Sequence, residues 1–357
     1  MIGLRRPRWF DERRPGLLLR LALAPLVPLS WLYGLGALAA RRLRSPRFRP
    51  ATRLSCRVVS VGNLGVGGAG KTPAAAWIAS QLRARGHKVA LASRGYGRRG
   101  RERVTVVSDG RFVCATADEA GDEPLLLAAH APGVPVLVGP DRRVVGLRAI
   151  AAFGVDVLVL DDGLQHHRLE RDVEVVAFDG SGLGNGHLLP RGPLREPLSA
   201  LRGADAVLVI DGPLPPEDAD AIDAHASAAR WFSARRRPVS LRPLVGGAAT
   251  APGLLAGQRV GILCGIARPA SLRRSLEALG ATVVEERAFP DHHRYRERDL
   301  RDLSHARLWI TTEKDALKIL PRWTHGADVR VLASGIEVEQ DEAFVDWLER
   351  TLRAKRR

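Results

Sequence analysis

Residues 65–72 carry a complete phosphate-binding pattern, with glycines at both ends of a short loop and Lys-Thr directly after the second one. An apolar run at residues 58–61 precedes the loop and predicts a buried strand, while residues 72–85 carry apolar side chains at helical spacing. A glycine-rich turn that contained Gly-Lys-Thr by chance would lack these flanks. In a strand–loop–helix unit, backbone N–H groups and the helix N-terminus bind nucleotide phosphates. The chain is therefore predicted to bind a nucleoside triphosphate through Gly65, Val66, Gly67, Gly68, Ala69, Gly70, Lys71 and Thr72.

The two residues that follow the last glycine of the loop have distinct predicted roles. Lys71 is expected to reach the β- and γ-phosphates, and the Thr72 hydroxyl is expected to hold Mg²⁺. The chain uses lysine sparingly, since only five of its 55 basic residues are lysine and the others are arginine. A lysine retained at this position fits a site that needs a compact point charge.

Two adjacent carboxylates follow another apolar run. Residues 156–160 predict a buried strand of the kind found in parallel sheets, and Asp161 and Asp162 end it. A carboxylate at the tip of a core strand is the expected second holder of Mg²⁺ in a phosphate-loop protein. An ordinary turn is the alternative, because Asp before glycine also favours a turn. Gln165 and His166 come soon afterwards, and either could orient the γ-phosphate or the acceptor.

Transfer of a phosphoryl group to an alcohol needs a base for the hydroxyl proton. Asp122, in the sequence Gly-Asp-Glu-Pro, lies at an expected helix start and is one candidate, although helix capping would explain it equally well. Asp291 and His292 open the sequence Asp-His-His after Pro290 and offer a second candidate, with an ordinary polar loop as the alternative. The residues alone leave both candidates open.

Length, cysteine content and charge limit the class of protein. The 357 residues are enough for two α/β cores, and three scattered cysteines without a C-x-x-C pair argue against a disulfide framework or a zinc site. The net charge of +16 is concentrated at the N-terminus, where residues 1–57 carry 13 arginines against two acidic residues. Elsewhere no basic stripe interleaved with aromatic residues predicts nucleic-acid binding. We therefore expect no nucleic-acid partner, and the sequence indicates no obligate protein partner.

Residues 21–40 contain no charged side chain, and arginines flank them on both sides. Twenty such residues are long enough to cross a bilayer, but Pro25 and Pro28 weaken a straight helix, and arginine on both flanks gives no inside–outside asymmetry. We interpret the segment as an anchor to a membrane surface, either spanning once or lying in the interface with its arginines on anionic headgroups. The alternatives are a buried core hairpin and a cleaved signal peptide, which would export a nucleotide-binding protein to a compartment without ATP.

Apolar runs alternate with helical patterns along the rest of the chain. This alternation predicts an α/β fold of the P-loop NTPase type, with a doubly wound, mostly parallel sheet and ligands at the carboxyl ends of the strands. Residues 212–217 predict turns, and the irregular stretch 235–253 predicts a domain boundary. The expected parts are an N-terminal hydrophobic, basic membrane-anchoring segment (1–50), a phosphate-loop domain (51–235) and a smaller C-terminal α/β domain (236–357). The expected strands are residues 58–61, 88–93, 134–138, 156–160, 173–178, 206–210, 260–264, 282–286, 308–311 and 329–332, and the expected helices are 72–85, 142–152, 269–279 and 339–354.

Taken together, the motifs resemble one family, the tetraacyldisaccharide 4'-kinases, which are the lipid A disaccharide kinases of Gram-negative bacteria. The match runs in order from the hydrophobic segment to beyond residue 315, and the whole set is highly specific although no motif beyond the phosphate loop is decisive. The matching segments are Ser60-Val61-Gly62-Asn63 with the loop, Ser93-Arg94-Gly95-Tyr96-Gly97, Gly121-Asp122-Glu123-Pro124, Leu160-Asp161-Asp162-Gly163-Leu164-Gln165-His166, Leu189-Pro190-Arg191-Gly192-Pro193-Leu194-Arg195-Glu196, Phe289-Pro290-Asp291-His292-His293 and Thr312-Glu313-Lys314-Asp315.

The resemblance implies a kinase that depends on ATP and Mg²⁺ and acts at the cytoplasmic face of the bacterial inner membrane. Its lipid substrate would be an acylated glucosamine disaccharide 1-phosphate, phosphorylated on the 4'-hydroxyl during lipid A and lipopolysaccharide biosynthesis. The resemblance implies Asp122 as the base, His292 as its partner from the other domain, and Thr72 with the two aspartates as the metal shell. By charge, the basic stretch around Arg191 and Arg195 suits a phosphorylated sugar. The candidate substrate contacts are Arg94, Tyr96, Gln165, His166, Arg191 and Arg195.

Three other classes of nucleotide-binding protein are alternatives to this interpretation. A GTPase would carry an [NT]-K-x-D motif, and the nearest sequence, Thr312-Glu313-Lys314-Asp315, has its lysine one place late. A membrane-associated P-loop ATPase of the partitioning or positioning type is the main alternative, but such proteins carry a second lysine early in the loop, where this chain has Val66. A nucleic-acid-binding ATPase lacks support away from the N-terminus.

Overall fold

The computed structural model describes residues 7–43, 51–67, 69–266, 268–291, 293–303 and 305–355. The chain divides into two compact units. The larger unit contains the described parts of Arg8–Arg235 and Ile336–Arg357, and the smaller one contains those of Met1–Pro7 and Arg236–Gly335. The larger unit therefore holds both the hydrophobic N-terminal helices and the C-terminal helix.

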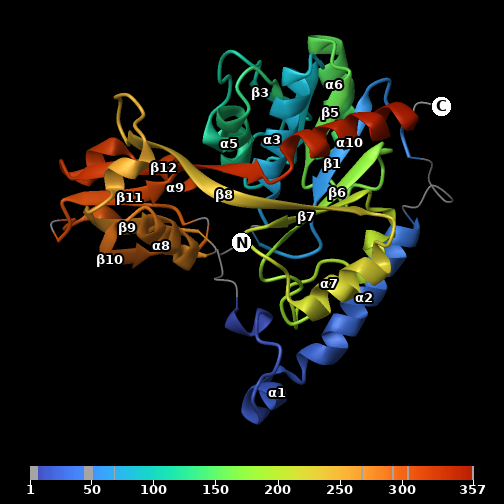
Figure 1. The fold of residues 1–357 in the computed structure, drawn as a ribbon, viewed down its shortest axis with the longest axis horizontal. Helices are drawn as coiled ribbons and strands as arrows, with labels where there is room; N and C mark the ends of the chain where they lie inside the picture. The colour runs from blue at the N-terminus through green and yellow to red at the C-terminus, as the bar shows by residue number, and fades with distance from the viewer. Residues whose placement is uncertain are drawn as a thin grey trace. The chain divides into compact units, whose positions relative to one another are not determined.

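The larger unit is built on a sheet whose strands are nearly all parallel (Figure 1). Pairing is parallel from β8 through β7, β6, β1, β5 and β2 to β4, and β3 runs antiparallel to β4. Buried apolar runs form these strands because parallel strands are covered on both faces. In spatial order the strands are β12 (Asp328–Val338), β8 (Arg230–Pro243), β7 (Ala206–Ile210), β6 (Val173–Asp179), β1 (Arg57–Gly62), β5 (Val157–Asp161), β2 (Val89–Ser93), β4 (Val136–Val138) and β3 (Thr105–Ser108).

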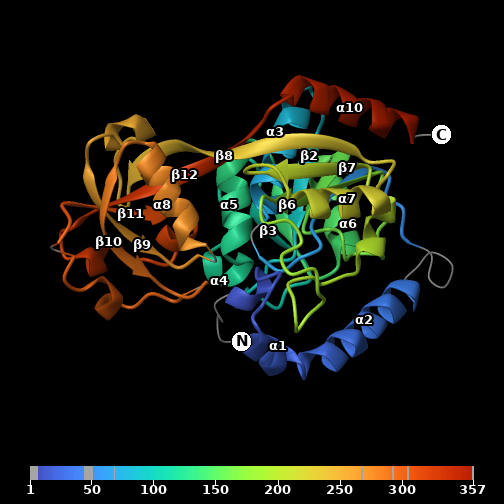
Figure 2. The same cartoon turned by 60° about the horizontal axis from the view of Figure 1, so that its bottom comes forward.

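Helices cover both faces of this sheet, as Figures 1 and 2 show. One face packs against α3 (Lys71–Ala84), α5 (Asp122–His130) and α10 (Asp341–Ala354) in a single apolar cluster. The other face packs against α6 (Arg142–Phe153) and, in a separate cluster, against the 3-10 helix η2 (Leu198–Gly203) and α7 (Pro216–His225). The predicted doubly wound α/β fold is therefore confirmed.

In the smaller unit, neighbouring strands pair in parallel from β10 to β12. Its strands follow the order β10 (Thr282–Ala288), β9 (Arg259–Cys264), β11 (Leu308–Thr312) and β12, next to which lies β8. Helix α8 (Pro269–Ala278) packs on this sheet through Leu272 and Leu276. The remaining short elements are η3 (Pro252–Leu255), η4 (Glu297–Leu300), α9 (Glu313–Ala316) and η5 (Pro321–Thr324).

One expectation for the stretch 235–253 is wrong. Residues 235–243 are not irregular, because β8 continues through them to Pro243. Phe232 and Ala234 are buried while the residues between and after them are exposed, so the strand has period-two alternation that the arginine run hides in the sequence. The turn predicted at 212–217 leads directly into α7, whose first residue is Pro216, a favoured position for proline.

The expected division into segments 1–50, 51–235 and 236–357 differs from these units at the C-terminal end. Helix α10 belongs to the larger unit, where Phe344 is fully buried against Trp77 of α3 and Phe232 of β8. Apolar residues of α10 recur at helical spacing and supply part of that core. The sequence pattern predicts this helix but not the sheet on which it packs.

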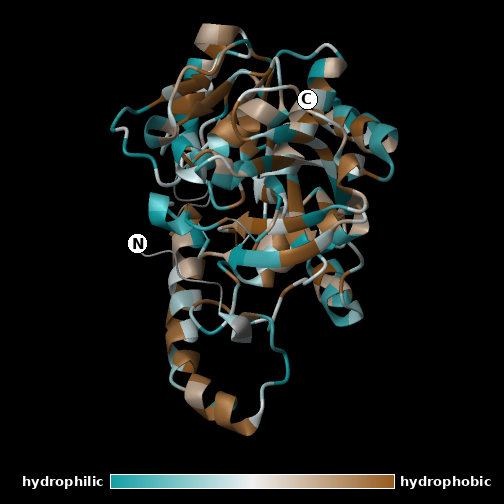
Figure 3. Ribbon diagram, turned by 90° about the vertical axis from the view of Figure 1, so that its left-hand side faces the viewer, coloured by the Kyte–Doolittle hydropathy of each residue, from teal (hydrophilic) through white to brown (hydrophobic). Residues whose placement is uncertain are grey.

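The N-terminal hydrophobic segment forms two helices, α1 (Leu17–Leu23) and α2 (Leu26–Leu43), with a bend of 50° at the break between them. Pro25 lies in the break, as expected for a residue that cannot continue a helix. Of the described helices, none is by itself long and apolar enough to cross a membrane, whereas the bent pair passes that test by length and composition. Figure 3 shows hydrophobic residues along both helices.

One side of α2 attaches to the larger unit and much of the remaining surface is exposed. Ser30 Oγ donates to the Leu188 carbonyl oxygen at 3.0 Å, and Tyr33 donates to that of Arg195 at 3.1 Å. Away from this contact, Leu18 is 85% exposed and Trp31 is 70% exposed. The alternative of a buried core hairpin is therefore wrong.

Candidate active site

The phosphate loop connects the central strand β1 to α3. Gly67 and Gly70 adopt left-handed backbone conformations with φ of 116° and 79°, which allows the chain to curl before α3 begins at Lys71. A Cβ on Gly70 would also lie 2.7 Å from a methyl carbon of Ile210, so only glycine fits there. Seven of the eight predicted loop residues are described; Gly68 lies outside the described residues.

A second segment braces this loop from outside. The N–H of Val66 donates to the Pro193 carbonyl at 2.8 Å, and the N–H of Arg195 donates to the Leu64 carbonyl at 2.7 Å. The Pro-Arg-Gly-Pro-Leu-Arg motif therefore runs alongside the loop and sets its position, which its composition alone did not reveal.

Lys71 points at polar groups at the start of the loop. Its Nζ donates to Asn63 Oδ1 at 2.9 Å and lies 3.5 Å from Asp162 Oδ1. Asn63 is itself buried, and its backbone oxygen accepts from Gln165 Nε2 at 3.1 Å. Asn63 is a functional candidate that the sequence did not mark as a site residue, although it precedes the phosphate loop.

Asp161 and Thr72 come together because β5 lies beside β1 in parallel register, with Asp161 opposite Val61. The Thr72 hydroxyl lies 3.3 Å from Asp161 Oδ2 and 3.4 Å from Oδ1. Asp161 is buried, and burial together with Glu123 and Asp162 raises the pKa of its carboxyl to about 7. A buried carboxylate of this kind lacks enough positive charge around it in the protein alone.

These two side chains fit Mg²⁺. Hydroxyl and carboxylate oxygens are its preferred ligands, and a cation beside Asp161 would stabilise the ionised carboxylate. Among the described residues, no group of three or more His, Cys, Asp or Glu side chains is arranged to hold a metal. Mg²⁺ takes one or two protein carboxylates and completes its shell with phosphate oxygens and water.

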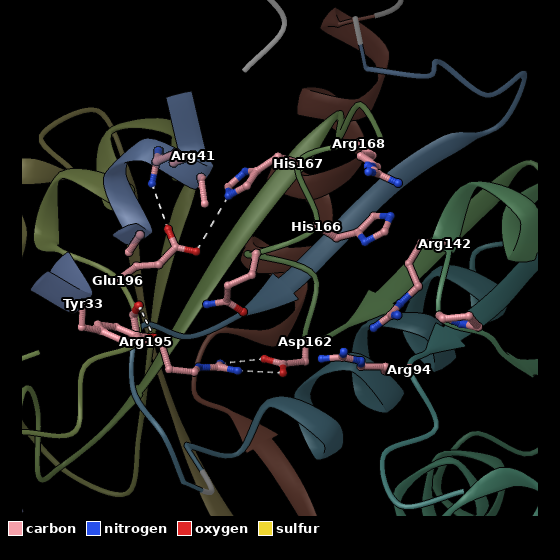
Figure 4. A pocket seen from close by; sticks show the side chains of 14 residues that line it. Tyr33, Arg41, Arg94, Arg142, Asp162, His166, His167, Arg168, Arg195 and Glu196 are labelled. Atoms are coloured by element: carbon pink, nitrogen blue, oxygen red, sulfur yellow. Dashed lines mark hydrogen bonds and ion pairs between the residues drawn. The ribbon is translucent and has the colours of Figure 1, made fainter. Parts of the chain in front are cut away.

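Asp162 faces two cations. Besides Lys71, Arg195 contacts its carboxylate with both Nη atoms, as drawn in Figure 4. Burial raises the pKa of Asp162, but Lys71 and Arg195 outweigh it and hold that pKa well below its usual range. Asp162 has φ of 55°, a left-handed conformation that is uncommon outside glycine.

The loop containing Arg94 and Tyr96 packs directly on the start of α5, which Asp122 begins. A Cβ on Gly121 would lie 2.5 Å from the Tyr96 carbonyl oxygen, and one on Gly95 would lie 2.8 Å from the Ala120 carbonyl oxygen. Both glycines have positive φ. The close backbone approach therefore requires glycine at both positions. It also fixes the backbone position from which the Asp122 side chain projects.

A pocket of about 580 Å³ opens next to Asp162. It brings together the predicted residues Arg94, Gln165, His166 and Arg195, and its lining also includes residues of α2. Figure 4 shows the charged side chains that converge on it. The further lining residues are Tyr33, Ala37, Ala40, Arg41, Pro140, Arg142, His167, Arg168 and Glu196. Of the predicted substrate residues, the described Tyr96 and Arg191 do not line this pocket.

Arg142 is the most unusual residue of the pocket. It is 3% exposed, its Nη1 donates to the Gly139 carbonyl at 3.1 Å, and its buried Nε has no hydrogen-bond partner among the described residues. Burial lowers its pKa to about 10, although Asp161 and Asp162 oppose the change. Beside it, burial and the charge of Arg142 lower the pKa of His166 to about 4. The sequence does not predict this burial, because charged residues at the start of a helix are usually exposed.

The second candidate base lies in the smaller unit. His292 is outside the described residues, so its position is not part of the structure. Its neighbours are held by ion pairs, with Asp291 2.9 Å from Lys314 Nζ and His293 2.9 Å from Asp299. The pair between Lys314 and Asp291 places the Thr-Glu-Lys-Asp motif beside the Pro-Asp-His-His motif within that unit.

The fold and the phosphate loop with its tandem aspartates define a P-loop nucleotide-binding protein. A sequence profile of one family, LpxK, described as tetraacyldisaccharide-1-P 4'-kinase, matches residues 22–353. The chain belongs to this family, and the resemblance found from its motifs is confirmed.

Individual relatives agree with the family. A protein named tetraacyldisaccharide 4'-kinase from Anaeromyxobacter dehalogenans is 45% identical over 93% of this chain and 90% of its own length. One of the same name from Dechloromonas aromatica is 43% identical over 98% and 97%. A crystal structure of LpxK from Aquifex aeolicus in complex with ATP has a TM-score of 0.75 at 29% identity, covering 93% of this chain and 99% of the other.

Proposed function

We propose that this chain transfers the γ-phosphoryl group of ATP to the 4'-hydroxyl of an acylated glucosamine disaccharide 1-phosphate in lipid A biosynthesis. Family membership makes it a phosphotransferase with an alcohol acceptor. The single observation that carries the proposal for this chain is the basic pocket, which is lined both by Asp162 and by residues of α2. The same comparisons do not favour the alternative of a partitioning ATPase.

The donor side of the proposed site is the phosphate loop. Its N–H groups and the α3 N-terminus would bind the triphosphate, and Lys71 would leave Asn63 and Asp162 for the β- and γ-phosphates. Thr72, Asp161 and Asp162 would hold Mg²⁺, which supplies charge neutralisation on the β- and γ-phosphates. The solved structure of LpxK from Aquifex aeolicus is a complex with ATP, which supports ATP as the phosphoryl donor.

The acceptor side is the pocket next to Asp162. Its volume is within the range of small-molecule sites, and Arg94, Arg142 and Arg168 supply positive charge for a phosphorylated sugar. Ala37 and Ala40 of α2 form an apolar wall of the same pocket. A substrate with a phosphorylated sugar and attached acyl chains matches a lining that is basic on one side and apolar on the other.

Asp122 is the proposed base. It is the first residue of α5, where the positive end of the helix dipole favours an ionised carboxylate. Asp122 would accept the proton of the 4'-hydroxyl as its oxygen bonds to the γ-phosphorus and the bond to ADP breaks. His292 from the smaller unit remains its proposed partner, as the family resemblance implies.

The exposed apolar surface of α1 and α2 supports attachment to a membrane. We propose that this segment lies in the interface at the cytoplasmic face of the inner membrane, with arginines at headgroup level. Because α2 also lines the pocket, this arrangement would bring a lipid substrate from the bilayer directly to the site.

A direct transfer assay tests the proposal. The purified chain in detergent micelles is incubated with ATP labelled in the γ-phosphate, Mg²⁺ and tetraacyldisaccharide 1-phosphate, and the lipid is separated for counting. We expect label on the lipid, and none when the lipid lacks a free 4'-hydroxyl. Release of labelled phosphate at the same rate with and without lipid, with no labelled lipid, would contradict the proposal.

A further inference from the structure

The segment that follows Asp162 needs a restraint from outside itself. It starts from the left-handed conformation of Asp162, and it carries the chain to β6 without forming a helix. At its start, the N–H of Gly163 donates to the Val61 carbonyl oxygen at 3.2 Å, and the N–H of His166 donates to that of Gly163 at 2.8 Å. A non-glycine residue persists in this conformation only when its surroundings fix it.

Arg171 supplies such a restraint. Its Nη1 donates to the Leu164 carbonyl oxygen at 2.9 Å and to the Gly163 carbonyl oxygen at 3.3 Å. These are the two carbonyl groups directly after Asp162. The side chain of Arg171 is only 21% exposed, so these bonds compete little with water.

Glu174 holds Arg171 in turn. It lies in β6, is 5% exposed, and its Oε2 is 2.8 Å from Arg171 Nη1. Besides this ion pair, a hydrogen bond from the Ser60 hydroxyl favours the ionised carboxylate. Burial raises the pKa of Glu174 to about 7, against the opposing charge of Arg171.

An ion pair buried in this way is a poor source of stability, because removing both charges from water offsets their attraction. Such a pair is better explained by what it orients. The packing of the loop against β1 is equally specific, since a Cβ on Gly163 would lie 2.3 Å from Ser60 Oγ. Ser60 is the sheet partner of Glu174, so the loop, β1 and β6 meet at this point.

We infer that Arg171 and Glu174 form a positioning pair that holds the loop after Asp161 and Asp162 in the conformation needed for phosphoryl transfer. The inference rests on the proposed function. Arg171 fixes the two carbonyls, the carbonyls fix the backbone of Asp162, and that backbone sets where both carboxylates point. A displacement of about 1 Å at a reacting site lowers rates by roughly 10²-fold, so a small relaxation of this loop has a large effect.

The test separates positioning from stability. Arg171→Met leaves Glu174 buried and without its arginine partner, so the Tm of this variant should fall. The double variant Arg171→Met/Glu174→Leu removes both charges, so its Tm should return toward that of the wild type. We expect the double variant to keep a kcat at least about 10-fold below wild type, because it still lacks the donors to Gly163 and Leu164.

A binding measurement gives a readout besides activity. The increase in Tm that ATP causes is measured at a series of Mg²⁺ concentrations. The double variant should need a several-fold higher Mg²⁺ concentration to reach half of its maximal increase in Tm. Arg171→Lys keeps the charge and one donor and should give intermediate values. Recovery of wild-type Tm, kcat and Mg²⁺ response together in the double variant would overturn the inference.

The matched control is the ion pair between Arg57 and Asp172. Its N–O distance is 2.9 Å and its side chains are 19% and 15% exposed, which is close to the Arg171 pair. Asp172 accepts from the N–H of Val58, and Arg57 donates to the Lys355 carbonyl oxygen, so the side chains of this pair contact residues outside the aspartate loop. Arg57→Met/Asp172→Asn should leave kcat and the Mg²⁺ response unchanged, and an equal effect there would also overturn the inference. Wild-type protein that labels no lipid would instead overturn the proposed function.

Discussion

Arg195 donates two hydrogen bonds to Asp162, from Nη1 to Oδ2 at 3.0 Å and from Nη2 to Oδ1 at 2.9 Å. The side chain of Asp161, the preceding residue, contacts the Thr72 hydroxyl instead. The two carboxyl groups therefore have pKa values moved in opposite directions, up to about 7 for Asp161 and well below the usual range for Asp162. Adjacent carboxyls separated in this way can take different roles.

Arg195→Lys should lower kcat/KM by about 10-fold or more. Lysine cannot make the paired contact to one carboxylate, so Asp162 would lose its fixed orientation. Steady-state kinetics with ATP and the lipid measure the effect. Arg191→Lys is the matched control from the same motif, and because Arg191 does not line the pocket its kinetics should stay near wild type.

Lys71→Ala should reduce phosphoryl transfer by at least about 10²-fold, since removal of one group that stabilises transition-state charge has effects of that size. Asp162 keeps its contact with Arg195, so we expect a folded protein with an unchanged circular dichroism spectrum. Lys88→Ala serves as the control lysine. Near-normal transfer by Lys71→Ala would contradict the role assigned to the phosphate loop.

Gly121→Ala should abolish most of the activity and also lower stability by about 1–3 kcal/mol, because the added Cβ meets the Tyr96 carbonyl and the backbone φ is 90°. The substitution would move the start of α5 and with it Asp122. Gly86 has the same φ of 90°, but no heavy atom would lie within 4 Å of its Cβ. Gly86→Ala should therefore show the backbone effect on Tm and retain activity; equal loss of activity in both would contradict this account.

Leu18→Glu/Leu32→Glu should release the chain from membranes without unfolding it. The two side chains are 85% and 64% exposed, so they contribute little to the core, yet they would enter the apolar part of a bilayer. Sedimentation with vesicles that contain anionic lipid measures the bound fraction. Leu254→Glu changes a leucine that is 58% exposed in the smaller unit and should bind as the wild type does.

The low pKa of His166 predicts a pH-dependent contribution to stability. Burial and Arg142 lower its pKa from 6.5 to about 4 in the folded protein, so between these values the unfolded chain binds more protons. The contribution of His166 to folding should fall as the pH decreases from 6.5 to 4. The Tm difference between the wild type and His166→Gln, measured at several pH values, isolates this contribution from the titration of Asp161 and Glu174. A constant difference across the range would contradict the prediction.

The elements that carry motifs could be predicted because local rules specify them. The glycine loop between β1 and α3, and the carboxylates at the end of β5, follow from strand and helix patterns on either side. The burial of Arg142 and the pairing of Arg195 with Asp162 could not be predicted, since they depend on residues far apart in sequence. Strand β8 was missed because its exposed positions are arginines, whose charge hides the alternation that marks a strand.

The chain returns to the larger unit at Ile336, inside β12, and this return has a practical consequence for dividing the protein into fragments. Phe344 and Leu348 of α10 complete the core around α3, although the smaller unit intervenes between them and residue 235. Expression ending at residue 235 would leave that apolar surface without its covering helix and invite aggregation. A soluble nucleotide-binding fragment would instead join residue 235 to residue 336 through a short linker, so that the last helix is translated with the core it covers.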